Sequence, residues 1–190
     1  MGNLRTTAFG LAAGLTLAAS QALATGIEIE IAGEGANGVI TIDLFEDIAP
    51  GHAERISTLA SEGKYDGVAF HRVIDGFMAQ TGDVQYANIT DYDARAAGRG
   101  GSEYSDIAAE ISDRTFARGT VGMARSADLN SANSQFFIMF APGEFLDGQY
   151  TIVGEVTSGL EVLDAIKRGQ ARSGAITGAP DVMVKVSVTD

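Results

Sequence analysis

Two segments place polar side chains inside an otherwise apolar, β-prone sequence. The first is residues 70–80, FHRVIDGFMAQ, where Arg72 and Gln80 stand among apolar residues. The second is residues 131–138, SANSQFFI, where Gln135 precedes two phenylalanines. Because a buried polar group without a partner costs about 2–7 kcal/mol, such side chains need fixed hydrogen-bond partners. Together the segments predict an apolar pocket with a few polar groups, which is typical of a small-ligand site.

Other catalytic chemistries find little support in the sequence. The chain has no cysteine, which excludes thiol catalysis and cysteine-based metal sites. Its two histidines, His52 and His71, are too few and too isolated for a histidine metal centre or a catalytic triad. Residues 98–101, GRGG, lack the Lys-Ser/Thr pair of a phosphate-binding loop. We therefore expect neither a metal nor a cofactor.

Alternating apolar residues predict short, half-buried strands along much of the chain. In residues 26–32, isoleucines at positions 27, 29 and 31 alternate with glutamates, and residues 39–45 repeat the pattern. A strand, a turn and a short strand are expected over residues 67–82. Further strands are expected over residues 119–124, 135–140, 150–156 and 182–188.

Two helices complete the expected elements. The first begins near Pro50, which suits a first helical turn, and continues to Gly63, and the second covers residues 160–167. Seven or eight short strands with two helices predict an antiparallel barrel or sandwich. Residues 84–113 are polar, acidic and rich in glycine, which predicts a long structured loop.

The first 24 residues have the features of a secretory signal peptide. Arg5 precedes an apolar run over residues 6–19, and residues 22–24, ALA, form a small-x-small cleavage pattern. The run is short for a membrane span of about 20 residues, which favours cleavage over an uncleaved anchor. The mature chain, residues 25–190, is then expected to be one domain that does not insert into the membrane. An exported chain without cysteine favours a bacterial periplasm over a eukaryotic secretory route.

The net charge of −12 also limits the partners of this chain. Such an acidic protein repels nucleic acid and anionic lipid headgroups, so neither is an expected partner.

Several motifs, in order and in register, resemble the cyclophilins, a family of peptidyl-prolyl cis-trans isomerases. They are residues 70–83, FHRVIDGFMAQTGD, residues 122–125, GMAR, residues 133–138, NSQFFI, and residues 145–154, FLDGQYTIVG. The resemblance covers about residues 39–188. It implies a mainly β fold, a closed eight-stranded antiparallel β-barrel capped by two α-helices. It also implies a binding site on the outer face of the barrel for proline-containing polypeptides, with no cofactor.

The resemblance assigns roles to particular residues. It implies that Arg72 is the catalytic arginine, assisted by Gln80 and Phe77. The residues expected to bind the substrate are Met78, Gly98, Ala124, Arg125, Gln135, Phe137, Phe145, Leu146 and Tyr150. Without the resemblance, Arg72 would be interpreted as a surface arginine that shields apolar neighbours or pairs with Asp75, and the apolar residues as ordinary core.

Three positions depart from the family pattern. Arg125 stands where many members have Asn, Tyr150 where many have His, and Phe145 where the best-known eukaryotic members have Trp. Because Phe lacks the indole N–H donor, the resemblance implies weakened cyclosporin binding with isomerase activity retained.

The function expected from the sequence is isomerisation of X-Pro bonds in unfolded or flexible exported proteins, which assists their folding. The alternative is a non-catalytic proline-peptide binder, or holdase, that uses the same pocket. A hydrolase has no support, because no serine stands in a Gly-x-Ser-x-Gly elbow.

Overall fold

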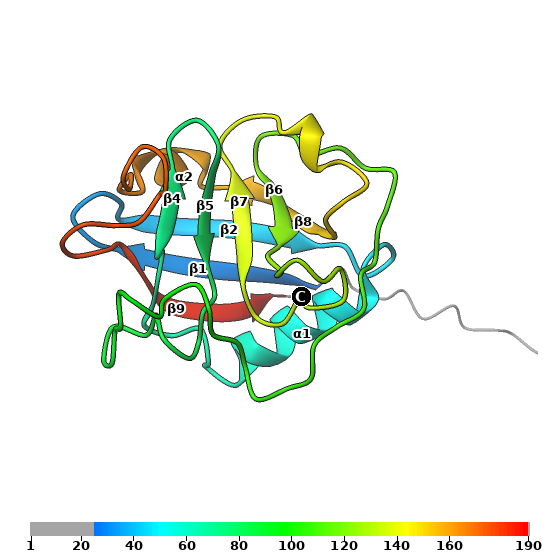
Figure 1. Cartoon of the computed structure of the whole chain (residues 1–190), viewed down its shortest axis with the longest axis horizontal. Helices are drawn as coiled ribbons and strands as arrows, with labels where there is room; N and C mark the ends of the chain where they lie inside the picture. Colours follow the sequence, from blue (N-terminus) through cyan, green and yellow to red (C-terminus); the bar gives the residue numbers. More distant parts are fainter. Residues whose placement is uncertain (1–24, 190) are drawn as a thin grey trace, which may run out of the picture.

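A computed structural model describes residues 25–189, which form one curled antiparallel sheet with two helices (Figure 1). The signal peptide predicted over residues 1–24 lies outside the described residues. Among residues 25–189, no helix has the length and apolar character needed to cross a bilayer.

The sheet contains nine strands in the order β3-β9-β1-β2-β8-β6-β7-β5-β4. The strands are β1 (Gly26–Ala32), β2 (Gly38–Leu44), β3 (Val68–Ala69), β4 (Arg72–Ile74), β5 (Met78–Thr81), β6 (Thr120–Met123), β7 (Phe136–Met139), β8 (Ile152–Ser158) and β9 (Val182–Thr189). In Figure 1, β4, β5, β7 and β6 cross the view steeply, whereas β1, β2 and β9 run nearly at right angles to them. This change of strand direction is the curl of the sheet, and the site described below lies on the group that contains β4, β5 and β7.

The expected closed barrel of eight strands is not confirmed, although the mainly antiparallel β fold is. The region over residues 67–82, predicted as two strands joined by a turn, contains three strands, β3, β4 and β5, which gives nine in all; β3 and β4 are the edges of the sheet. They follow one another along the chain and exchange partners, because β3 pairs with β9 and β4 pairs with β5. At the bend between them, the Phe70 N–H donates to the Asp181 carbonyl at 2.9 Å. The split therefore arises where one run of chain passes between the two edges.

The strand alternation places one face of β1 and β2 in the core. Ile27, Ile29, Ile40 and Ile42 are all buried, whereas Glu28 on the other face of β1 is exposed. This matches the period-2 pattern of the sequence. A second cluster, under β5 and β7, contains Phe45, Met78, Phe116, Phe137, Met139, Leu146 and Ile152.

The helices are α1 (Pro50–Ser61) and α2 (Leu160–Ala165), and a short 3-10 turn covers Glu144–Leu146. Both α-helices begin where the sequence predicts, and α2 ends at Ala165, two residues before the expected end. Ala49, which precedes α1, offers no side-chain cap. Instead, the Glu110 carboxylate accepts hydrogen bonds from the Gly51 and His52 N–H groups, each at 3.1 Å. The long loop over residues 84–113 is thus tied to α1.

Candidate active site

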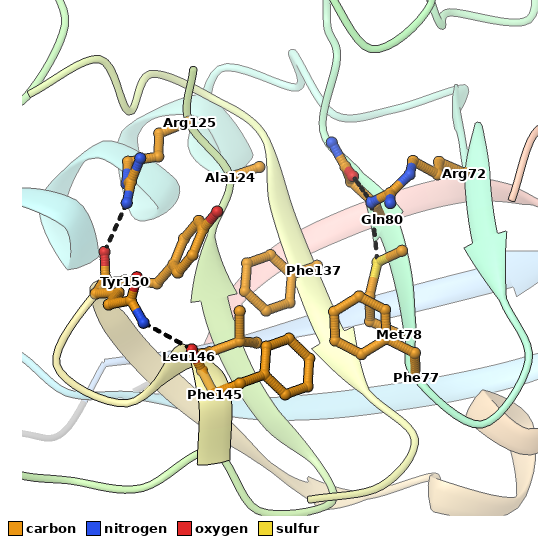
Figure 2. A pocket seen from close by; sticks show the side chains of 11 residues that line it. Arg72, Phe77, Met78, Gln80, Ala124, Arg125, Phe137, Phe145, Leu146 and Tyr150 are labelled. Atoms are coloured by element: carbon orange, nitrogen blue, oxygen red, sulfur yellow. Dashed lines mark hydrogen bonds between the residues drawn. The ribbon is translucent and has the colours of Figure 1, made fainter. Parts of the chain in front are cut away.

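Strand pairing brings the polar residues of the two sequence segments together. In the register of the sheet, Arg72 of β4 lies opposite Gln80 of β5, and Gln80 lies opposite Phe137 of β7. Because directly paired residues point to the same face of a sheet, the three side chains share one face. Figure 2 shows them lining one cavity.

A line of hydrogen bonds holds the Arg72 side chain in place. Arg72 Nη1 donates to Gln80 Oε1 at 3.0 Å, and Gln80 Nε2 donates to Gln135 Oε1 at 2.9 Å. Gln135 Nε2 in turn donates to the Gly100 carbonyl at 2.8 Å. On the other side, Arg72 Nε donates to the Ser173 carbonyl at 3.1 Å. Each amide is thus oriented by its neighbour, which fixes the guanidinium without neutralising it.

The Arg72 guanidinium keeps its positive charge uncompensated by a carboxylate. Within residues 25–189, no ion pair includes Arg72. The alternative pairing with Asp75 does not occur, because Asp75 Oδ1 accepts from Arg168 Nε at 2.9 Å. Burial lowers the pKa of Arg72 from its usual value, and an arginine still remains protonated at any ordinary pH. The site therefore presents a half-buried cation with free N–H capacity.

The floor of the cavity is apolar. Met78, Phe137 and Leu146 are buried and line a cavity of about 400 Å³. The Phe137 ring stacks on Phe116 with centroids 5.7 Å apart, which fixes the ring from below. An apolar floor below a fixed cation suits a ligand that is largely hydrocarbon but carries one polar group.

The rim is formed by more exposed groups. Phe145 is 64% exposed and packs on Phe77 with ring centroids 5.4 Å apart. On the opposite rim, the Arg125 guanidinium lies over the Tyr150 ring, 4.3 Å from its centroid. Arg125 Nη2 also donates to the Gln149 carbonyl at 2.9 Å, so the arginine holds the backbone at Gln149 in place on the rim.

The end of β6 leaves backbone groups available beside the cavity. The Ala124 N–H donates to the Gln135 carbonyl at 2.9 Å and so extends the pairing of β6 with β7. Within the described residues, the Ala124 carbonyl and the Arg125 N–H make no hydrogen bond. These two groups can pair with the backbone of an extended peptide, as an added strand would.

Gly98 and Gln135 do not line this cavity, in contrast to the other expected site residues. Both instead line a second cavity of about 370 Å³, which shares Gln80, Ala124 and Arg125 with the first. The buried Asp83 carboxylate fixes this region by accepting from the Gly98 N–H at 2.7 Å. Gly98 has φ of +92°, and a Cβ there would lie 3.3 Å from the His71 ring, so this position strongly favours glycine.

Sequence reasoning missed several lining residues. Gln149 lines the first cavity, and Arg99, Ser126, Ser131 and Asn133 line the second. Gln149 lies inside the motif 145–154 and could have been found there. Ser131 and Asn133 likewise lie inside the segment 131–138. Arg99 and Ser126 lie in loops whose path no periodic pattern indicates.

The two histidines lie outside both cavities. The His71 ring is buried, and neither of its nitrogens has a hydrogen-bond partner in the described part of the chain. Burial lowers the pKa of His71 to about 4, against a partial opposing effect of the nearby Asp83 charge. Among residues 25–189, no group of three or more His, Cys, Asp or Glu side chains is placed to hold a metal ion.

Comparison with known families agrees with this geometry. The family model described as cyclophilin type peptidyl-prolyl cis-trans isomerase/CLD matches residues 27–188. A Brucella suis protein named probable peptidyl-prolyl cis-trans isomerase is 54% identical over 154 residues, which are 80% of this chain and 78% of that protein. An Arabidopsis thaliana protein named peptidyl-prolyl cis-trans isomerase CYP18-1 is 39% identical over 144 residues, which are 72% of this chain and 81% of that protein.

Solved structures show the same fold. A cyclophilin-type isomerase from Cryptosporidium parvum superposes with a TM-score of 0.72 at 24% identity, covering 88% of this chain and 99% of that one. A second structure, described as that protein in the presence of the dipeptide Ala-Pro, gives a TM-score of 0.71 at 25% identity, covering 87% of this chain and 99% of that one.

Proposed function

The chain belongs to the cyclophilin-type peptidyl-prolyl cis-trans isomerases, and on this premise we propose that it accelerates X-Pro rotation in the first cavity, with Arg72 as the catalytic residue. The observation that carries the assignment is the Arg72–Gln80–Gln135 line, which fixes an unpaired cation above an apolar floor. The proline ring rests on Met78, Phe137 and Leu146, between rim residues Phe77 and Phe145. The related structure described in the presence of Ala-Pro supports a proline-containing ligand.

The chemistry of amide rotation explains why a fixed cation suffices. Resonance gives the peptide bond a rotation barrier of about 18–20 kcal/mol, and uncatalysed X-Pro exchange takes tens to hundreds of seconds. In the twisted state the prolyl nitrogen lone pair is no longer delocalised, so it can accept a hydrogen bond from Arg72. A donor that bonds the twisted state and not the planar one lowers the barrier selectively. Exchange at roughly 1,000 per second requires a reduction of about 7 kcal/mol, which such a donor and positioning can supply.

The remaining site residues position the peptide. The free Ala124 carbonyl and Arg125 N–H support a role as backbone partners for an extended substrate. Gln80 and Gln135 are positioning residues, since they touch Arg72 directly or through one amide. Tyr150 and Arg125 form one wall, and Gly98 lines the adjoining cavity.

The test is NMR exchange on a short Ala-Pro peptide, with wild type, Arg72→Ala and Arg168→Ala compared. Loss of one preorganised donor typically costs about 10²- to 10³-fold in rate, so we expect that loss in kcat/KM for Arg72→Ala. Arg168→Ala is the matched control, because Arg168 is a neighbouring arginine that pairs with Asp75 and lines neither cavity.

Peptide binding, followed by chemical shifts in the same samples, separates the alternatives. We expect Arg72→Ala to weaken binding much less than it slows exchange. If peptide affinity and exchange rate fell by the same factor, Arg72 would be mainly a binding residue. Binding by wild type without faster exchange would favour the holdase function.

Two finer proposals concern the whole chain. Residues 1–24 direct export to a bacterial periplasm, where the mature chain assists folding of exported proteins; the signal features of the sequence support this. N-terminal sequencing of the protein from a periplasmic fraction tests it.

The second proposal is that the sheet closes into a barrel in which β3 and β4 form one bent strand. The Phe70 to Asp181 hydrogen bond supports it. Slow hydrogen exchange of the Phe70 amide is the expected result.

A further inference from the structure

The second cavity adjoins the first and carries a different chemistry. The two share Gln80, Ala124 and Arg125, so a peptide that lies along the end of β6 passes both. Whereas the first has an apolar floor, the second is lined mainly by polar and glycine residues, including Ser126, Ser131 and Asn133. Among residues 25–189, no carboxylate lines either cavity.

Two arginines line this second cavity, Arg99 from the long loop and Arg125 from the end of β6. Arg99 is exposed, and its side chain makes no hydrogen bond or ion pair with any residue from 25 to 189. Arg125 donates to the Ser126 and Gln149 carbonyls at 2.9 Å each, which are neutral acceptors. Its Nε is buried and has no partner in the described chain. Arg99 thus keeps all of its side-chain donors free at the cavity, and Arg125 keeps its positive charge there with neutral partners only.

The acidic residues nearest the lining accept hydrogen bonds from N–H groups other than those of the two arginines, and Asp106 Oδ1 accepts from Asn133 Nδ2 at 2.9 Å. Asp83 Oδ2 accepts from the Gly98 and Gly100 N–H groups beneath the loop, and its Oδ1 accepts from the Gln85 and Tyr86 N–H groups. Asp128 Oδ1 accepts from the Asn130 N–H within its own turn. Neither arginine has a carboxylate within 4.0 Å in the described residues. In a chain of net charge −12, two unpaired arginines at one cavity form a local exception.

We propose that the second cavity selects substrates with an acidic side chain close to the proline, and that Arg99 and Arg125 are the specificity-determining residues. This rests on the proposed function, because it takes the proline to occupy the first cavity. A carboxylate accepts two N–H groups from a guanidinium and so matches the free donors. Because the two cavities share Gln80, Ala124 and Arg125, and an extended chain advances about 3.3–3.6 Å per residue, we expect the acidic residue within about two positions of the proline.

The experiment compares end-capped peptides that differ in one side chain. The parent is Gln-Ala-Pro-Phe, and Gln is replaced by Glu or Lys; in further sets the same substitutions are placed directly before and directly after the proline. NMR exchange gives kcat/KM for each. We expect Glu to exceed Gln by about 3- to 10-fold at one position, with Lys below Gln, and the ratio to shrink toward unity at high salt.

Variants then locate the effect. Arg99→Gln should lower the Glu to Gln ratio of kcat/KM at that position by at least about half. Arg99→Glu should reverse the order, so that the Lys peptide exceeds the Glu peptide. Arg95→Gln is the matched control, since Arg95 is exposed in the same loop and lines neither cavity. The substitution removes the same charge as Arg99→Gln.

The outcomes separate the two proposals. No faster exchange of the Gln peptide would overturn the proposed function itself. Fast exchange with equal rates for Glu, Gln and Lys at every position would overturn the acidic preference alone. A preference that Arg95→Gln reduces as much as Arg99→Gln would also overturn it, because it would then arise from net charge and not from the cavity.

Discussion

At the scale of single residues, the site depends on a cation whose partners are all neutral. The Arg72 guanidinium contacts the Gln80 amide, the Ser173 carbonyl and the Met78 sulfur, and none of these compensates its charge. A carboxylate partner would hold the guanidinium equally well, but it would compete with the prolyl nitrogen for the same N–H groups. The choice of glutamine at position 80 therefore keeps the arginine fixed and still able to donate.

The first residue-scale prediction concerns pH. Arginine remains protonated, and no histidine lines the first cavity, so kcat/KM for a neutral peptide should be nearly constant from about pH 6 to 8. His71, with its pKa lowered to about 4, stays neutral over that range. The measurement is NMR exchange in buffers of constant ionic strength. A bell-shaped profile with limiting slopes of one would show that an acid or base had been overlooked.

The second residue-scale prediction concerns Phe145 at the rim. Phe145→Trp adds an indole N–H donor, and one net hydrogen bond of about 1 kcal/mol corresponds to several-fold tighter cyclosporin A binding. Titration followed by fluorescence or calorimetry measures the dissociation constants. Val184→Trp is the control for a nonspecific effect of an added indole, because the Val184 side chain of β9 is exposed. Equal affinities of wild type and Phe145→Trp would contradict the assignment.

At the scale of elements, the loop over residues 84–113 acts as part of the scaffold. Its Glu110 carboxylate caps α1, and Asp83, directly before the loop, holds the glycine segment beside the second cavity. Burial opposes ionisation of Glu110, but the hydrogen bonds from the His52 ring and from the Gly51 and His52 N–H groups outweigh it and lower its pKa. One loop therefore connects the stability of a helix to the shape of a cavity.

The element-scale prediction follows from this cap. Glu110→Ala leaves two N–H groups of the first helical turn without their acceptor and should lower the free energy of unfolding by about 1–2 kcal/mol. For a chain of this size that corresponds to a decrease in Tm of roughly 2–8 °C. Urea unfolding and thermal scans check it. Glu103→Ala is the control, because Glu103 is 76% exposed in its pair with Lys64 and should cost less than about 1 kcal/mol. Equal costs for the two variants would argue against capping.

At the scale of the whole molecule, the curled sheet buries a histidine that cannot readily accept a proton. The pKa of His71 is lowered to about 4 by burial, whereas an unfolded histidine titrates near 6.5. Between these values the unfolded chain binds the proton and the folded chain does not, so stability falls as pH decreases from about 6.5 to about 4. At about 1.4 kcal/mol per unit, the full loss is about 3 kcal/mol.

The whole-molecule prediction is that this loss can be assigned to one residue. The ring resonances of His71 should stay constant from about pH 8 to pH 5. His71→Gln should reduce the dependence of unfolding free energy on pH between about 7 and 5, relative to wild type. Denaturant titrations at each pH, with His52→Gln as the second histidine variant, provide the comparison. A His71 ring that titrates near pH 6.5 would contradict the prediction.

The sequence alone determined the local elements and the chemistry of the site. Period-2 isoleucines predicted β1 and β2, and Pro50 marked the start of α1, because these signals depend only on near neighbours. The motifs around Arg72 and Gln135 indicated a pocket of mixed polarity, since a polar residue in an apolar strand must find a partner.

Only the tertiary structure decided which residues are neighbours across the site. The Gly100 carbonyl that ends the hydrogen-bond line lies 35 positions from Gln135, and the Glu110 cap acts on a helix 58 and 59 positions away. The bend that divides β3 from β4, and the meeting of Arg99 with Arg125 at one cavity, likewise have no local signal. Such contacts arise when strands and loops far apart in the sequence are paired by the fold, and no periodic pattern within a segment specifies them.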